Sequence, residues 1–352
     1  MVPQVLSIIQ IQFAGAERTK ALGLYATVIS AGAVAGQVVG GALATADLFG
    51  TSWRPVFLVN VPIGALLLLA GRRTLAATRG QSARRRDLRG VALLSAAALL
   101  VMLPLILGQT QHWPLWTYAS FAGGAVFVIV GVRYLRALGR RGGDPLIDLA
   151  IFADAGVARG LASIFASFVA YGGFLFAFSF YLQSGLGDSP LRSGLIYAPL
   201  AIAFAVVSLG HARLGAGVVR WLPLAGLGSL AAGYVTLGMI NQSGDWHVVL
   251  SIVLLVVVGA GFGAGFSPVI GLTVARVPPR HAPDASGLLN TTIQLGYVTG
   301  VASLGSYFVA VAKPGNAASS GHAFFAVSIG LAALAVVAAL LAVSIRRSGA
   351  AA

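Results

Sequence analysis

Apolar runs of about 20 residues, separated by short polar segments, divide the chain from end to end. The hydrocarbon core of a bilayer is about 30 Å thick, and an α-helix needs about 20 residues to cross it. Each run therefore predicts one membrane-spanning helix. We expect ten complete spans, near residues 20–46, 55–72, 90–108, 115–138, 157–184, 193–212, 222–241, 247–275, 285–312 and 322–345.

The scarcity of charge supports a membrane protein. Charged residues make up 9% and hydrophobic residues 58% of the 352 positions, whereas soluble domains carry about 25% charged residues. The expected fold class is an all-α polytopic membrane protein with about ten complete transmembrane helices plus an N-terminal half-helix. The half-helix is the apolar stretch 2–13, which is too short to cross and lacks the basic start and cleavage site of a signal peptide.

The basic residues alternate from loop to loop. One side of the membrane would carry only Arg54, Arg192 and Lys313, and the other side would carry the rest of the 23 Lys and Arg residues. Cytoplasmic loops are the basic ones. We therefore predict a multi-pass protein of the cell (inner or plasma) membrane, with loops 76–89 and 139–156 and the C-terminus in the cytoplasm. Such loops also favour anionic lipid headgroups.

Glycines reveal an internal repeat between the first and the ninth expected span. At a constant offset, Gly23, Gly32, Gly36 and Gly41 align with Gly287, Gly296, Gly300 and Gly305. Parallel repeats of this kind build one large class of secondary transporters, with the substrate path between the halves. The glycines have two compatible interpretations, which are close helix packing and an interface that slides as the halves alternate.

Five segments in order resemble the fourteen-span drug:proton antiporters of the major facilitator superfamily. They are PQVLSIIQIQFAGAERTKALGLY (3–25) with AGAVAGQVVGG (31–41), WRPVFLVNVPIG (53–64), PLIDLAIF (145–152), YLQSGLGDSPLRSGLIYAP (181–199) and DASGLLNTTIQLGYVTGVA (284–302). Gly32, Gly36, Gly40 and Gly41 fit that family's antiporter motif in its fifth span. Gln37 stands where the family has a proline.

The resemblance implies major-facilitator-like helical bundles in three parts. Residues 1–75 would be the remainder of the N-terminal transmembrane bundle, 76–145 a cytoplasmic basic loop with an extra helix pair, and 146–352 the C-terminal six-helix bundle. It also implies an N-terminal truncation, since about the first three and a half spans of the family have no counterpart. The implied partners are protons, a small lipophilic or cationic substrate and the lipid bilayer.

Proton-relay groups are absent from the middle of every expected span. The nine acidic residues fall in loops or at span edges, and so do the five histidines. A carboxylate within the membrane would be the default coupling candidate. Asp47, at the outer end of its span, is the nearest candidate for proton coupling. Alternatively, it is only a solvated residue at the end of a helix.

The polar groups inside the spans are amides, hydroxyls and aromatic rings. The candidate substrate-binding residues are Asn290, Gln294, Gln183, Tyr181 and Gln37. Asn290 and Gln294 lie four residues apart and share one helix face, while Gln183 and Tyr181 end a span rich in phenylalanine. An apolar cavity with few amides suits a lipophilic ligand, and aromatic faces attract cations. Alternatively, the amides bond across helices and the rings face lipid.

Other classes of function lack their signatures. The chain has no P-loop, no metal-ligand cluster, no cysteine and no basic face with interleaved aromatic residues. We therefore expect no enzyme activity, no catalytic residue, no cofactor, no metal and no nucleic-acid partner, and the sequence carries no signal for an oligomeric state.

Two functions remain open. One is a proton-driven exporter of lipophilic or cationic drugs or antibiotics. The other is a truncated, non-transporting membrane remnant, partner subunit or scaffold.

Overall fold

The computed structural model describes residues 17, 32, 36, 39–46, 50–51, 54–74, 87–108, 111–278 and 281–347. The expected half-helix at 2–13, most of the first span, Gln37 and Asp47 lie outside these residues. Within them all regular structure is helical, which confirms the all-α fold class.

Twelve α-helices follow one another along the described chain. They are α3 (Arg54–Leu58), α4 (Asn60–Thr74), α5 (Leu88–Leu107), α6 (Leu115–Arg140), α7 (Ala155–Phe180), α8 (Pro190–Gly210), α9 (Ala216–Val219), α10 (Leu222–Ile240), α11 (Val248–Val274), α12 (Ala282–Gly300), α13 (Ser306–Val311) and α14 (Ala317–Arg347). Short 3-10 segments, η2 (Leu149–Ala153) and η4 (His211–Arg213), and two π-helical segments, η3 (Tyr181–Gly185) and η6 (Val301–Gly305), join or extend them.

Eight described helices are long and apolar enough to cross a membrane. They begin at residues 54, 88, 115, 155, 190, 222, 248 and 317 and match eight of the ten expected spans. The ninth expected span, 285–312, is the continuous path α12–η6–α13, which is not among the eight. Its polar residues, such as Asn290 and Gln294, explain this because they lower its hydropathy.

Local sequence signals set where several helices begin. The Asp87 side chain accepts a hydrogen bond from the Gly90 N–H at 2.8 Å, and Asp154 caps α7 in the same way through the Gly156 N–H at 2.6 Å. Ser189 caps α8, and Pro190 occupies its first turn. Side-chain oxygens at these positions satisfy backbone donors that a helix start leaves free.

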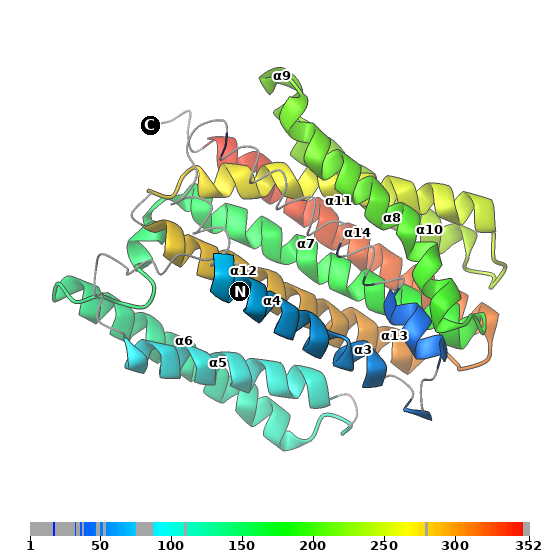
Figure 1. Cartoon of the computed structure of the whole chain (residues 1–352), viewed down its shortest axis with the longest axis horizontal. Coiled ribbons are helices and arrows are strands. Elements are labelled where there is room, and N and C mark those ends of the chain that lie inside the picture. Colours follow the sequence, from blue (N-terminus) through cyan, green and yellow to red (C-terminus); the bar gives the residue numbers. More distant parts are fainter. Residues whose placement is uncertain are drawn as a thin grey trace.

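The helices from α7 to α14 form a bundle with α7 at its centre (Figure 1). Helix α7 packs against α14 and α12, α10 packs against α11 and α14, and α8 packs against α11. Large side chains fill the centre, and the fully buried aromatic ones include Phe174, Phe178, Tyr181, Tyr234 and Phe324.

Small residues let α7 and α12 approach closely. A Cβ added at Gly172 of α7 would lie 2.5 Å from the Tyr297 carbonyl oxygen, and one at Gly300 of α12 would collide with the Val169 carbonyl oxygen. A Cβ at Gly296 would meet the Phe165 carbonyl oxygen at 2.9 Å. Backbone-to-backbone packing of this kind is what holds membrane helices together, so the packing interpretation applies to these glycines.

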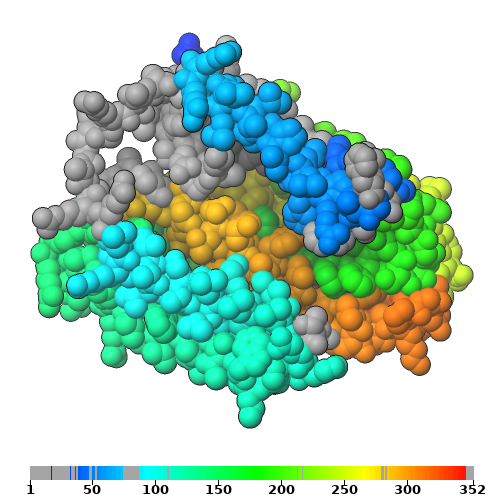
Figure 2. All heavy atoms as spheres, turned by 60° about the horizontal axis from the view of Figure 1, so that its bottom comes forward, coloured from blue at the N-terminus to red at the C-terminus, as the bar shows by residue number. Residues whose placement is uncertain are grey.

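Helices α5 and α6 form an antiparallel hairpin that touches α12. In Figure 2 the hairpin (cyan) and α3–α4 (blue) flank a hollow in which α12 (gold) remains visible. Helices α4, α6, α11 and α14 run toward the left in Figure 1, and α8 ends at the top. We call the end of the molecule where these helices finish the arginine-rich end, because most of the described basic residues lie there.

Candidate functional site

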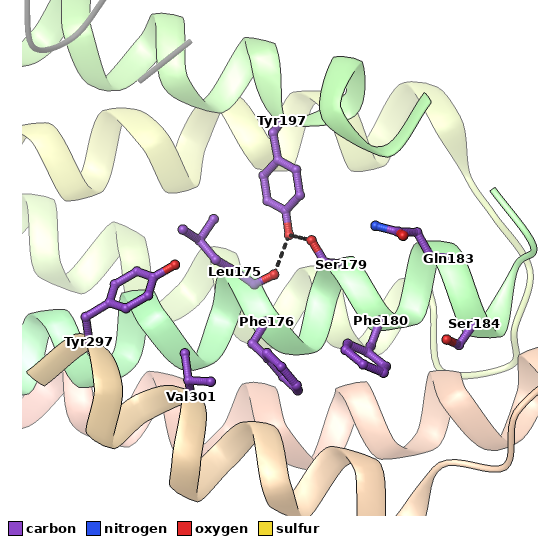
Figure 3. Close-up of a pocket in the computed structure, with 9 residues that line it drawn as sticks. All are labelled: Leu175, Phe176, Ser179, Phe180, Gln183, Ser184, Tyr197, Tyr297 and Val301. Atoms are coloured by element: carbon purple, nitrogen blue, oxygen red, sulfur yellow. Dashed lines mark hydrogen bonds between the residues drawn. The ribbon is translucent and has the colours of Figure 1, made fainter. Parts of the chain in front are cut away.

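A cavity of about 310 Å³ opens between α7, α8 and α12, toward the end opposite the arginine-rich one (Figure 3). Its lining residues are uncharged, and they are Leu175, Phe176, Ser179, Phe180, Gln183, Ser184, Tyr197, Tyr297 and Val301. This volume is at the lower end of the range for small-molecule sites, about 300–1,000 Å³.

Both π-helical segments border this cavity. Gln183 and Ser184 belong to η3, and Val301 begins η6. The wide turn of η3 is closed by the Leu186 N–H, which donates to the Tyr181 carbonyl oxygen at 3.0 Å. Single π-helical turns in α-helices occur frequently at functional sites. Here the π-helical turn of η3 holds two of the lining residues, Gln183 and Ser184.

A hydrogen-bonded pair of helices forms one wall. The Tyr197 hydroxyl of α8 donates to the Leu175 carbonyl oxygen of α7 at 2.8 Å, and its oxygen lies 3.3 Å from the Ser179 hydroxyl. In Figure 3 the Gln183 amide lies on the same side of α7 as these two hydroxyls. The wall therefore offers one amide and two hydroxyls to a ligand.

Aromatic rings form the opposite wall. Phe176 and Phe180 stack with ring centroids 4.7 Å apart, and Phe180 and Tyr297 are 39% and 37% exposed. A second aromatic cluster lies beyond the cavity, where Tyr171 stacks on Phe262 at 4.5 Å. The phenylalanines of α7 thus divide between the cavity, this cluster and the buried core.

The structure places the predicted substrate residues in three different surroundings. Gln183 lines the cavity. Tyr181 is fully buried, stacks on Phe324 at 5.5 Å and does not line the cavity. Asn290 and Gln294 are exposed on α12 and lie outside the lining, on the face that continues through Tyr297 to Val301.

The sequence did not single out Ser179, Tyr197 or Tyr297. Tyr297 follows Gln294 by three residues and so shares its helix face, which was an available signal. Tyr197 meets Ser179 only through the packing of α8 on α7, which neither segment encodes by itself.

The antiporter-motif glycines have unequal surroundings. A Cβ at Gly41 would lie 2.7 Å from the Pro190 carbonyl oxygen, whereas one at Gly32 or Gly36 would meet no atom of the described residues within 4 Å. A Cβ at Gly40 would touch a Val56 methyl group at 3.8 Å. Near Gly41, the Leu191 N–H donates to the Thr45 hydroxyl oxygen at 3.1 Å. The end of this helical stretch therefore rests on the start of α8.

A charged network joins three helices at the arginine-rich end. The Arg276 guanidinium donates to the Asp154 carboxylate at 3.0 Å and to the Ile345 carbonyl oxygen at 2.6 Å. Arg159 donates to the Ser344 carbonyl oxygen at 3.1 Å. The Gly156 N–H, with the Arg276 guanidinium as a second donor, lowers the pKa of the Asp154 carboxyl below its usual value.

The acidic residues from Asp87 to Asp284 lie in loops or in the first turn of a helix, as the sequence indicates. Asp188 is buried, with 7% of its side chain exposed, and pairs with Arg192 at 3.1 Å. The described residues contain no group of three or more His, Asp or Glu side chains that could hold a metal.

Eight membrane-length helices, with basic residues gathered at one end, are the architecture of a polytopic helical membrane protein. A family description matches residues 1–301, and the chain belongs to the Major Facilitator Superfamily. This membership makes it a multi-pass membrane protein of a transporter family rather than an enzyme.

Several named proteins are similar to most of this chain. The chain is 34% identical to the probable actinorhodin transporter of Streptomyces coelicolor, over 88% of this chain and 54% of the relative. It is 32% identical to multidrug resistance protein Stp of Mycobacterium tuberculosis, over 84% and 53% of the two chains. Multidrug efflux pump LfrA of Mycolicibacterium smegmatis is 30% identical, over 88% and 60%. The chain thus spans about half the length of these relatives.

Proposed function

We propose that the chain acts in efflux of small, lipophilic, planar aromatic compounds and belongs to the fourteen-span drug:proton antiporter branch. The observation that carries the proposal is the uncharged cavity between α7, α8 and α12. The names of three relatives, which describe a transporter, a resistance protein and an efflux pump, support the direction of transport.

The cavity chemistry defines the substrate class. Phe176, Phe180 and Tyr297 offer ring faces and edges, and aromatic pairs are worth about 0.5–1.5 kcal/mol beyond the area that they bury. Gln183 and the Ser179 hydroxyl can hydrogen-bond carbonyl or hydroxyl groups of a ligand, and the Tyr197 oxygen, whose proton is donated to Leu175, can accept from a ligand hydroxyl. The lining carries no carboxylate, so a cationic drug would be attracted only through the ring faces.

The mechanism that follows is alternating access. The N-terminal and C-terminal bundles would rock against each other, with the cavity on the C-terminal bundle, and the contact of Thr45 with Leu191 would part when that end opens. Coupling to protons and a cytoplasmic C-terminus are parts of the proposal that rest on the resemblance and on the basic loops.

Transport is tested in proteoliposomes that contain the purified chain and an imposed pH gradient. The probes are a neutral hydroxylated anthraquinone and the planar cation ethidium. We expect saturable flux of the neutral probe that stops when an ionophore collapses the gradient. Binding without flux would contradict the exporter function, and absence of both would contradict the cavity as a substrate site.

A second candidate function is a partner subunit that binds the compound but does not move it. The exposed amides of Asn290 and Gln294 favour it, because polar groups on a membrane helix normally face protein or water. The same proteoliposomes decide between the two, since this candidate predicts binding in the absence of any gradient-dependent flux.

A further inference from the structure

A cluster of arginines stands at the arginine-rich end of the α5–α6 hairpin. Arg133, Arg136 and Arg140 of α6 are exposed, and Arg89 at the start of α5 is exposed at the same end. Their spacing of three and four residues puts the α6 arginines on one helix face. They form a basic surface separate from the cavity and from the Asp154–Arg276 network.

The nearby carboxylate of Asp87 forms no ion pair with the α6 arginines among the described residues. The Asp87 oxygens accept hydrogen bonds from the Gly90 N–H, the Tyr134 hydroxyl and the Leu146 N–H, at 2.8, 2.9 and 3.1 Å. Across the part of the chain that the structure describes, no ion pair involves Arg133, Arg136 or Arg140. Their positive charge therefore remains available.

The same face of α6 is apolar below the arginines. Val126, Ile129 and Val130 are 56%, 54% and 45% exposed, and they lie three to seven residues before Arg133. The opposite face packs on α5, where a Cβ at Gly124 would meet Val101 at 2.9 Å and one at Gly131 would meet Leu94 at 3.5 Å. The arginine face thus points away from the protein.

Helix length fixes the depth of these arginines. Residues 115–132 of α6 span about 27 Å at 1.5 Å per residue, which nearly fills the hydrocarbon core. Arg133 then lies at the edge of the core, and Arg136 lies about 4.5 Å farther out, within a headgroup layer about 5–8 Å thick. Acyl chains would contact the valines and isoleucine, and phosphates would meet the guanidinium groups.

We propose that this α6 face (Val126, Ile129, Val130, Arg133, Arg136 and Arg140) is a binding site for anionic phospholipid. The guanidinium groups bind the phosphodiester of the headgroup through charge-assisted hydrogen bonds, and the apolar strip binds an acyl chain. The occupant is a lipid rather than a free phosphate because charge and apolar surface are continuous on one helix face.

The test uses the full chain in a neutral detergent, titrated with phosphatidylglycerol or with phosphatidylcholine. Bound lipid is counted by native mass spectrometry, and the thermal unfolding midpoint is followed. We expect phosphatidylglycerol to be retained and to raise the midpoint, with phosphatidylcholine having little effect. An Arg133→Gln/Arg136→Gln variant should bind phosphatidylglycerol about 10- to 30-fold more weakly, at about 1 kcal/mol for each arginine.

A matched control removes the same charge elsewhere. Arg213 and Arg220 are exposed at the same end, and Arg220 lies 5.5 Å from the Trp221 ring. Arg213→Gln/Arg220→Gln should keep the phosphatidylglycerol affinity. Equal losses in both double variants would overturn the site, because net charge alone would then explain binding. An equal midpoint shift with inorganic phosphate would overturn the lipid as occupant.

Folding of the variants is checked by circular dichroism. If the Arg133→Gln/Arg136→Gln variant loses helicity, the two single variants are measured, and each should bind phosphatidylglycerol about fivefold more weakly. Single variants that fold and bind like the wild type would contradict the proposal.

Discussion

The Tyr197 hydroxyl donates a 2.8 Å hydrogen bond to the backbone carbonyl oxygen of Leu175, and both residues line the same cavity. The bond joins α8 to α7 beside the Ser179 hydroxyl, which lies 3.3 Å from the Tyr197 oxygen. The Tyr197 side chain therefore closes this wall of the cavity, and it also holds two hydroxyl groups where a ligand can reach them.

Tyr197→Phe should lower both stability and ligand affinity. Removal of the hydroxyl leaves the Leu175 carbonyl oxygen without this donor, which costs about 1 kcal/mol in the free energy of unfolding. The control is Tyr234→Phe, since the buried Tyr234 hydroxyl has no hydrogen-bond partner within the described chain, and its loss should be neutral or stabilising. Unfolding in mixed detergent measures both. Equal losses in the two variants would contradict the role of the Tyr197–Leu175 bond.

Gln183→Leu should weaken binding of a neutral hydroxylated anthraquinone. The amide is the one flexible side-chain amide in the lining, and loss of a ligand hydrogen bond of about 1–1.5 kcal/mol predicts about tenfold weaker binding. Gln242→Leu, in the loop after α10, serves as the control and should bind as the wild type. Fluorescence quenching gives both dissociation constants. Unchanged affinity in Gln183→Leu would remove Gln183 from the site.

The sequence predicted the fold better than the site. Hydrophobic length located the eight spans that the structure confirms, because a helix must satisfy its backbone within the bilayer whatever its neighbours are. It also located acids such as Asp87 and Asp154 outside the spans, and the structure shows that they cap helices. Residues 285–312 are less easily recognised as a span by hydropathy, because Asn290 and Gln294 make this segment less apolar.

Side-chain surroundings required the tertiary packing. From residue type alone, both Tyr181 and Gln183 were predicted to bind substrate. They lie two residues apart in η3, and their side chains point in different directions. Tyr181 stacks on Phe324 in the core, whereas Gln183 lines the cavity. Which face of α7 meets α8, α12 or α14 is decided by small residues such as Gly172 on those faces, and the pattern of polar residues does not encode it.

Gly300→Ala should separate α12 from α7. The added methyl group would collide with the Val169 carbonyl oxygen and approach the Gly173 nitrogen to 2.8 Å, and backbone cannot yield as a flexible side chain can. Overpacking of this kind costs about 1–3 kcal/mol. Gly287→Ala on the same helix is the control, because its methyl group would meet none of the described residues within 4 Å, and it should stabilise α12 by about 0.5–1 kcal/mol. A destabilised Gly287→Ala with an unaffected Gly300→Ala would contradict the packing.

Acid should weaken the network that joins α7, α11 and α14. The Asp154 carboxyl has a lowered pKa in the folded chain, because it accepts from the Gly156 N–H and from Arg276. A group of this kind stabilises the fold above its unfolded pKa, and that contribution disappears as the pH falls through the folded pKa, which lies below the ordinary value of 3.8.

Asp154→Asn should therefore lose about 1 kcal/mol at pH 7 and should show a flatter fall in stability below about pH 4. Arg276→Gln should lose at least as much at pH 7, since it also removes the hydrogen bond to the Ile345 carbonyl oxygen at 2.6 Å. Asp245→Asn is the control, because Asp245 is exposed in a loop and accepts from the Ser243 hydroxyl at 3.0 Å. Thermal unfolding midpoints between pH 7 and pH 3 measure all three. If Asp245→Asn reduced the fall in stability below about pH 4 as much as Asp154→Asn, the Asp154–Arg276 pair would not be the cause of that fall.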